Sequence, residues 1–230
     1  MAKRTIALCG CLAWVLTGCM ASGIEEDAAE AAIGQDEAVN EASSALEPPF
    51  QVVDADTTFQ GNCGRDVDAK ISTTAAGKPV IELIFEDLSV LAEDPRTRDQ
   101  KLCNVRVHVK SNPRYRLSLE QVFYQGRAEI DANGGSGTVS ARAFFDGLLG
   151  IDGFKRFGPG YADNFTVRVD QGTPATLCGA DTYLNLLVDI TARRRSNSDG
   201  FSEIAIQRGS ATADLERRPT IWCGIYVEPC

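Results

Sequence analysis

The sequence predicts an all-β domain over residues 50–230: a β-sandwich, or a jelly-roll-like arrangement, of antiparallel strands. Apolar residues recur at every second position in many short segments, and this alternation is typical of a strand that buries one face. Turn-forming residues separate these segments, whereas no run of ten or more residues shows the 3.6-residue period of a helix. At least eight short strands joined by short turns favour two packed sheets in a single domain.

Each predicted strand is defined by apolar residues that share one parity and should therefore face the core. In chain order these residues are Ile81, Leu83 and Phe85; Val105, Val107 and Val109; Tyr115, Leu117 and Leu119; Val139, Ala141, Ala143 and Phe145; Phe165, Val167 and Val169; Leu184, Leu186, Val188 and Ile190; Ile204 and Ile206; and Ile221, Ile225 and Val227. Segments rich in Gly, Pro, Asn and Ser predict the turns, at 76–79, 111–113, 133–137, 158–160 and 196–200.

The N-terminus predicts export. Lys3 and Arg4 precede an apolar run over residues 6–16, and eleven residues are too few to span a bilayer about 30 Å thick as a helix. A charged start followed by a short apolar segment is typical of a secretion signal. The run ends in Leu-Thr-Gly-Cys at residues 16–19, which resembles the lipobox recognised by the bacterial lipoprotein signal peptidase.

Cleavage at this motif would make Cys19 the first residue of the mature chain, with diacylglycerol on its thiol. We therefore expect a lipoprotein signal peptide over residues 1–18 and a protein held by its lipid in the cell envelope, at the outer membrane. Two or more acyl chains anchor a protein far more firmly than one. The alternative is an ordinary signal cut after Ala21, which would remove Cys19 and release an extracellular protein.

Residues 19–49 are predicted to form a disordered acidic tether. From Met20 to Pro49 the chain is rich in Ala and Glu, with eight acidic residues and no basic one. Such a segment buries too little apolar surface to offset chain entropy, and its like charges extend it. Residues 50–230 contain 21 Lys and Arg against 24 Asp and Glu, a net charge of −3, so nucleic acid is not an expected partner.

Five cysteines lie in the predicted domain, and their wide spacing fits one or two disulfides rather than a metal knuckle or a redox motif. Cys103 shares the parity of core residues, and a bridge to Cys63 would close a loop of about forty residues, worth on the order of 4 kcal/mol. Cys178 is expected to pair near the C-terminus with Cys223 or Cys230. Cys223 has inward parity and is expected to be a buried free thiol if left over; an intermolecular bridge is the alternative.

Six short motifs are spread over the domain. They are Gly61-Asn62-Cys63-Gly64; the alternating strand from Cys103 to Pro113; Tyr124-Gln125-Gly126 followed by 131–134; Phe157-Gly158-Pro159 followed by Asp163 and Phe165; Cys178-Gly179; and the terminal Cys230. Together they resemble the secreted proteins of fungi and bacteria grouped as domain of unknown function family 4360, over residues 55–230. The resemblance implies two disulfides, Cys63 with Cys103 and Cys178 with Cys230, and it brings no established activity.

The sequence contains no convincing catalytic constellation, and we predict no enzyme, cofactor or metal site. The only histidine, His108, has outward parity on a predicted strand between cationic neighbours, which suits neither a metal ion nor a Ser/His/Asp triad. Adjacent carboxylates at 86–87 and 93–94 would point to opposite faces of a strand, which does not suit a glycosidase pair. Three further aspartates surround a glycine-rich segment without the compact spacing of a calcium loop: Asp146, Asp152 and Asp163.

The most suggestive surface feature is a candidate anion-binding face. If strands near 104–110 and 114–120 form a hairpin, five basic side chains lie together on its outer side: Arg106, His108, Lys110, Arg114 and Arg116. A second cluster is Arg193-Arg194-Arg195. We hypothesise that this face binds an anionic polysaccharide or the phosphates of envelope lipids. The alternative is pairing of these cations with carboxylates across strands, namely Glu82, Glu86, Glu120 or Asp170.

These observations favour a membrane-anchored cell-envelope lipoprotein that acts as a non-catalytic binding or structural module. Its expected partners are the membrane, through the N-terminal lipid, and a polysaccharide or another envelope component. Two alternatives stay open. A carbohydrate-active enzyme or carbohydrate-binding module on a jelly-roll scaffold would need a suitable cleft, and a secreted interaction or inhibitor-like protein would need cleavage without lipidation.

Overall fold

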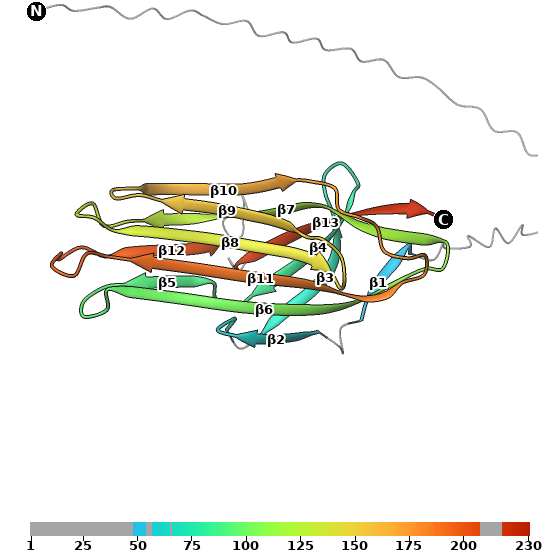
Figure 1. Ribbon diagram of the computed structural model, residues 1–230, viewed down its shortest axis with the longest axis horizontal. Helices are drawn as coiled ribbons and strands as arrows, with labels where there is room; N and C mark the ends of the chain where they lie inside the picture. The colour runs from blue at the N-terminus through green and yellow to red at the C-terminus, as the bar shows by residue number, and fades with distance from the viewer. Residues whose placement is uncertain (1–47, 54–56, 65, 208–217) are drawn as a thin grey trace, which may run out of the picture. The chain divides into compact units, whose positions relative to one another are not determined.

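Two antiparallel β-sheets pack face to face in this protein (Figure 1). The computed structural model describes residues 48–53, 57–64, 66–207 and 218–230, all within the unit Ala45–Cys230. The predicted signal peptide, the lipidation site Cys19 and the tether up to residue 47 lie outside the described residues and stay predictions. Within the described part, no helix is long and apolar enough to cross a membrane.

Sheet A has six strands in the order β1-β6-β11-β8-β9, with β2 paired to β6 as well. Their bounds are Phe50–Val52 (β1), Thr58–Gly61 (β2), Arg98–Ser111 (β6), Ser136–Phe145 (β8), Ile151–Phe157 (β9) and Asp181–Arg193 (β11). The β6–β11 ladder is continuous, from Lys110 opposite Asp181 to Arg98 opposite Arg193. Side chains on the outer face of sheet A therefore form regular rows across β6 and β11.

Sheet B has seven strands in the order β3-β4-β13-β7-β12-β5, with β10 also paired to β7. Their bounds are Val67–Thr73 (β3), Pro79–Phe85 (β4), Ser89–Ala92 (β5), Tyr115–Glu129 (β7), Ala162–Asp170 (β10), Ser202–Gln207 (β12) and Thr220–Pro229 (β13). The central strand is β7: β13 and then β12 pair along one edge, and β10 pairs along the other.

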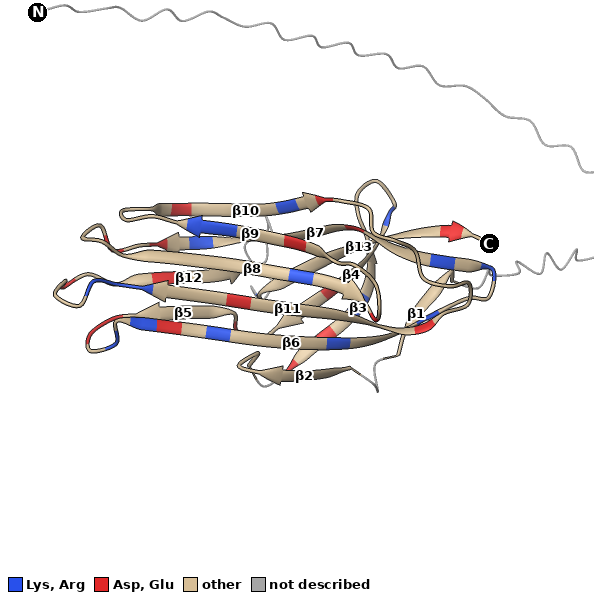
Figure 2. Cartoon of the chain, in the orientation of Figure 1, with Lys and Arg blue, Asp and Glu red and all other residues tan. Residues whose placement is uncertain are grey.

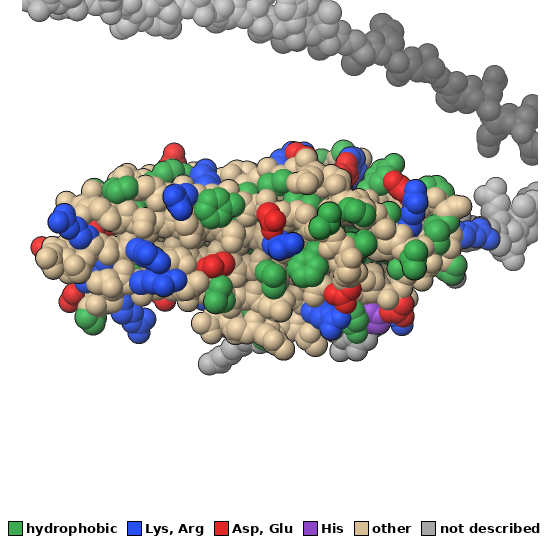
Figure 3. Space-filling model, in the orientation of Figure 1, with side chains coloured by type: hydrophobic (Ala, Val, Ile, Leu, Met, Phe, Trp, Pro, Cys, Tyr) green, Lys and Arg blue, Asp and Glu red, His purple; other side chains and the backbone are tan. Residues whose placement is uncertain are grey.

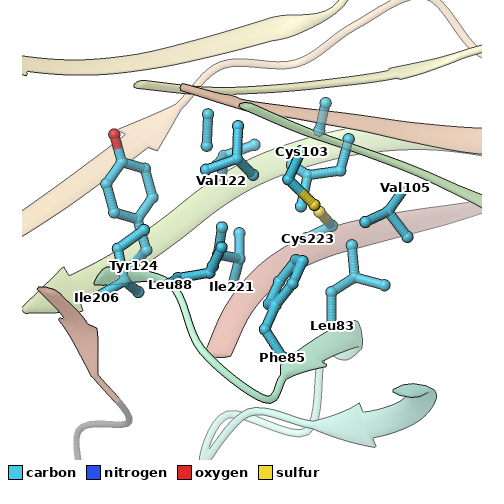
Figure 4. Close-up of a cluster of buried hydrophobic side chains, with 14 of the residues drawn as sticks. Leu83, Phe85, Leu88, Cys103, Val105, Val122, Tyr124, Ile206, Ile221 and Cys223 are labelled. Carbon is cyan, nitrogen blue, oxygen red and sulfur yellow. The ribbon is translucent and has the colours of Figure 1, made fainter. Parts of the chain in front are cut away.

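The core fills the space between the sheets, and the predicted parity is confirmed. Every predicted inward residue within 105–109, 139–145 and 184–190 is buried. Figure 4 shows side chains from several strands of both sheets gathered in this core, among them Leu83, Phe85, Val105, Val122 and Ile221. Residues of the same parity at strand ends are only partly buried, as at Val169 and Val227. The predicted fold class, an all-β sandwich with disulfides, is therefore confirmed.

Tyr124 joins the two sheets and has the largest fully buried side chain among the described residues. It extends from β7 of sheet B, and its hydroxyl donates a 2.9 Å hydrogen bond to the carbonyl of Gly153 in β9 of sheet A. Burial raises the pKa of the Tyr124 phenol, which keeps the hydroxyl a donor at neutral pH. The bond fixes the part of β9 in which Asp152 and Phe154 are exposed on the opposite side.

The domain contains two disulfides. Cys63 is bonded to Cys103, and Cys178 is bonded to Cys230. These are the pairings that the family resemblance implies. Cys223 is a free thiol in the core, and burial raises its pKa to about 12, so the unreactive thiol form prevails at neutral pH.

The predicted turns connect strands, but most of them cross between the sheets. The turn at 76–79 lies between β3 and β4, which pair in sheet B. The turn at 111–113 instead leads from β6 in sheet A to β7 in sheet B, and the turn at 196–200 leads from β11 in sheet A to β12 in sheet B. Neighbours along the chain are therefore often in opposite layers.

Candidate functional site

The five basic residues predicted to share one face are divided between the sheets. Arg106, His108 and Lys110 lie on β6 in sheet A, Arg116 lies on β7 in sheet B, and Arg114 lies in the turn between them. The prediction of a common anion-binding face is therefore wrong. It assumed a β6–β7 hairpin, whereas β6 pairs with β11 and β7 pairs with β13 and β10.

Carboxylates form ion pairs with three of the cations that were assigned to this face, Arg106, Lys110 and Arg116. Arg106 Nη2 lies 2.5 Å from Asp146 Oδ2, and Arg116 Nε lies 2.5 Å from Glu228 Oε2. This is the cross-strand pairing of the alternative hypothesis, with different partners. Three of the four carboxylates named there contact other cations: Glu82 with Lys70, Glu120 with Lys78, and Asp170 with Arg168.

His108 is buried, contrary to the prediction of an exposed strand histidine. Its ring stacks on that of Tyr183 with 4.8 Å between centroids, and its Nε2 contacts the carboxylate of Asp181. The hydrogen bond from His108 and the charge of Lys110 hold the pKa of Asp181 below its usual value. The Arg106 guanidinium covers the Tyr183 ring at 3.9 Å. Sequence reasoning missed this cluster because Asp181 lies 73 residues beyond His108 and meets it only through β6–β11 pairing.

The arginine triplet at the end of β11 is also divided. Arg194 is buried, where its Nη2 donates a 2.8 Å hydrogen bond to Asp94 Oδ1 and its Nε donates to the carbonyl of Arg96. Arg194 is therefore a structural anchor between two loops. Arg193 is exposed on the outer face of sheet A, directly opposite Arg98 of β6.

The outer face of sheet A has a central depression of about 530 Å³. One row of side chains crosses it over five paired strands, in the order Gln60, Asn104, Leu187, Arg142 and Asp152. The next row, two residues along, is Leu102, Asp189, Ser140 and Phe154. These residues come from β2, β6, β11, β8 and β9, so five segments distant in sequence build this surface.

Apolar side chains are unusually exposed in and around this depression. Phe154 is 59% exposed, Leu102 is 52% exposed and Leu187 is 39% exposed. Hydrophobic side chains lie in the middle of this face, between paired charges (Figure 3). An exposed apolar patch rimmed by polar groups is a common mark of a binding surface.

Polar groups in the depression are held in fixed orientations. Arg142 Nε lies 3.4 Å from Asp152 Oδ1. Asp189 Oδ1 accepts hydrogen bonds from Gln100 Nε2 at 3.0 Å and from the Thr191 hydroxyl at 3.3 Å. The depression therefore combines apolar surface and the amides of Gln60 and Asn104 with oriented guanidinium and carboxylate groups, which is the usual composition of a ligand-binding site.

Strand β2 forms one wall of the depression through Gln60 and Gly61. Gly61 has a φ of +94°, and a Cβ at this position would lie 2.3 Å from the carbonyl oxygen of Leu102. Only glycine allows the backbone to approach β6 this closely. The Asn62 amide then donates a 2.7 Å hydrogen bond to that carbonyl, and the Cys63–Cys103 disulfide follows.

The three aspartates considered for calcium bind separate protein groups. Asp146 contacts Arg106 and the side-chain amide of Asn185, Asp152 contacts Arg142, and Asp163 accepts from the amide of Asn164. The glycine-rich segment between them contains strand β9. Over the described ranges, no three His, Cys, Asp or Glu residues are grouped as metal ligands would be.

Comparison with known proteins identifies a family. Two solved structures resemble the chain: the enzymatically active domain of bacteriophage CBA120 tailspike protein 4, and TmCBM61 in complex with β-1,4-galactotriose. The match to the tailspike domain has 11% sequence identity and a TM-score of 0.25. It covers 75% of this chain and 20% of the tailspike chain. The second is 9% identical with a TM-score of 0.25, over 76% of this chain and 90% of the other. No curated protein matches. The family model described as a domain of unknown function, DUF4360, matches residues 52–218, and the chain therefore belongs to that family.

Proposed function

We propose that this protein is an exported, lipid-anchored module of the cell envelope that binds a polysaccharide on the outer face of sheet A, without catalysis. The central depression carries this proposal. A pyranose ring has apolar C–H faces and a rim of hydroxyl groups. Exposed Leu187 and Phe154 suit the apolar faces, and Gln60, Asn104 and Asp189 suit the hydroxyls.

The shape of the surface favours a chain over a small compact ligand. The depression is open, and its two rows of side chains cross paired strands whose backbones are fixed by continuous ladders. A site built on regular strands holds its geometry better than one built on loops. A polymer laid over the face would contact several rows at once.

The carboxylates of the depression support binding rather than hydrolysis. A glycosidase generally needs two carboxyl groups that flank the scissile bond and are free to act on the substrate. Of the two carboxylates that line the depression, Asp152 stands beside the Arg142 guanidinium, and Asp189 accepts hydrogen bonds from Gln100 and Thr191. Their geometry suits hydrogen bonds to sugar hydroxyls.

The binding proposal predicts loss of affinity when the apolar surface is removed. Leu187→Asp and Phe154→Ala should each weaken binding of the full mature chain to its best glycan by about tenfold or more, equivalent to about 1.4 kcal/mol. A glycan array finds the ligand, and titration calorimetry measures the affinity. Tyr226→Ala is the matched control, since Tyr226 is 49% exposed on β13 of sheet B. Equal losses in all three variants, or no glycan bound, would refute the proposal.

Anchoring is supported by the lipobox-like residues 16–19 and is tested separately. Intact mass of the protein from native membranes should include the diacylglycerol and amide-linked acyl chains on Cys19. Reduction should add the mass of four hydrogens, from the two disulfides. A soluble product that begins after Ala21 would contradict the lipid anchor and leave an extracellular binding protein.

A further inference from the structure

Three arginines converge at one end of the outer face of sheet A, beyond the central depression. Arg98 of β6 lies directly opposite Arg193 of β11, and Arg156 of β9 lies opposite Thr138 of β8. Figure 2 shows Lys and Arg at the same end of β6, β9 and β11. The three arginines line a second depression of about 480 Å³.

These arginines differ from the other strand arginines on this face. Arg106 and Arg142 each face a carboxylate, whereas Arg98, Arg156 and Arg193 form no ion pair within the described part of the chain. Arg98 donates a 2.5 Å hydrogen bond to the side-chain oxygen of Gln100, which is uncharged. Their charges therefore remain available to a ligand.

The arrangement is unfavourable without a ligand. Like charges directly opposite each other on paired strands repel, and Arg98 and Arg193 occupy such a pair. One carboxylate, Asp189, lines the same depression, and it already accepts hydrogen bonds from Gln100 and Thr191. Three positive charges thus surround a space with one negative charge, and an anion placed there would relieve the repulsion.

The arginine site is continuous with the central depression. Asp189 lines both depressions. Ser136 and Thr138 line the arginine site, and their hydroxyls are neutral donors for oxyanions. A single extended ligand can therefore contact the apolar centre and the basic end together.

We propose that Arg98, Arg156 and Arg193 bind an anionic group, a carboxylate or a sulfate ester, of an acidic polysaccharide whose neighbouring sugars lie in the central depression. This rests on the proposed function and specifies its ligand class. The planar guanidinium suits such groups because its paired N–H donors match two oxygens of a carboxylate or sulfate. A polysaccharide is favoured over a lipid headgroup because the arginine site is continuous with the central depression, whose side chains suit sugars.

The test uses pairs of glycans that differ only in charge. The probes are polygalacturonate, alginate and dextran sulfate, each compared with its neutral counterpart, carboxyl-reduced or unsulfated. The full mature chain should bind at least one acidic form tenfold or more tightly than its neutral form, less so at high salt. Arg156→Glu with Arg193→Glu should abolish that preference. Arg127→Glu with Arg168→Glu makes the same charge change on sheet B strands and should preserve it.

The outcomes separate this inference from the proposed function. Equal binding of acidic and neutral forms, unchanged in the Arg156/Arg193 variant, would overturn the arginine site and leave polysaccharide binding in place. An acidic preference that depends on the arginines but not on Leu187 or Phe154 would support the arginine site and refute the central depression. Binding to phosphatidylglycerol vesicles, but to no acidic glycan, would overturn the inference in favour of lipid headgroups. No binding to any probe would contradict both.

Discussion

Removal of the Cys63–Cys103 disulfide, by Cys63→Ala with Cys103→Ala, is expected to lower the free energy of unfolding by about 4 kcal/mol and also to weaken glycan binding. The two cysteines are 40 residues apart, and opening that loop restores entropy to the unfolded chain. Both sulfurs lie in the core, since Cys63 is fully buried and Cys103 nearly so. Urea denaturation followed by tryptophan fluorescence measures the stability change.

The effect on binding follows from the position of β2. This four-residue strand pairs with β6 from Gly61 opposite Cys103 to Thr58 opposite Arg106, and it carries Gln60 into the wall of the depression. Among the described strands, β2 is hydrogen-bonded to one neighbour only, β6, so its position depends strongly on the covalent link that the disulfide makes to β6. Without it, Gln60 should lose its fixed position.

The second disulfide provides a matched control. Cys178 and Cys230 are 52 residues apart, so Cys178→Ala with Cys230→Ala should cost about the same 4 kcal/mol. It ties the end of β13 to the connection before β11 and takes no part in the depression. Glycan affinity, measured where both variants are folded, should fall only in the Cys63/Cys103 variant. An equal fall in both would contradict the local role of β2.

Tyr124→Ala is expected to lower the free energy of unfolding about as much as removal of a disulfide, because it leaves a cavity in the core. Replacing a large buried ring by alanine typically costs about 3–5 kcal/mol, because the surrounding side chains fill the cavity only partly. Tyr124 is fully buried and belongs to the core cluster drawn in Figure 4. Thermal and urea denaturation measure the loss.

Tyr124→Phe isolates the contribution of the hydroxyl. It keeps the ring but leaves the buried Gly153 carbonyl without its hydrogen bond, at a cost of about 1–3 kcal/mol. Because Gly153 lies between Asp152 and Phe154, this variant should also weaken glycan binding modestly. Unchanged stability in Tyr124→Phe would contradict the bridging role of the hydroxyl between the sheets.

The fold class was predictable because the alternation of apolar and polar residues within one short segment shows which face of a strand is buried. Val105, Val107 and Val109 alternate with polar residues, and all three are fully buried. The turn residues at 158–160 likewise connect β9 to β10, and those at 133–135 lead into β8, which begins at Ser136. Each inference needs only a few consecutive residues.

The candidate site was not predictable in the same way. The prediction of a basic face failed because it took neighbours in sequence, β6 and β7, to be neighbours in a sheet, and they lie in opposite layers. The row from Gln60 to Asp152 spans five strands, and Arg98 meets Arg193 across almost a hundred residues of sequence. Neither arrangement has a local signal, although the exposed apolar Leu187 and Phe154 stand at outward positions of alternating strands.

The amino-acid sequence by itself determined the all-β class, the positions of most turns and, in the strands that it predicts, the face that packs into the core, because these depend on local periodicity and turn chemistry. The tertiary structure alone decided which strands are neighbours and in what register. Register sets which side chains share a surface, and it depends on the packing of the whole sandwich. It therefore also decided that Arg106 and Arg116 are neutralised on separate sheets while Arg98, Arg156 and Arg193 converge.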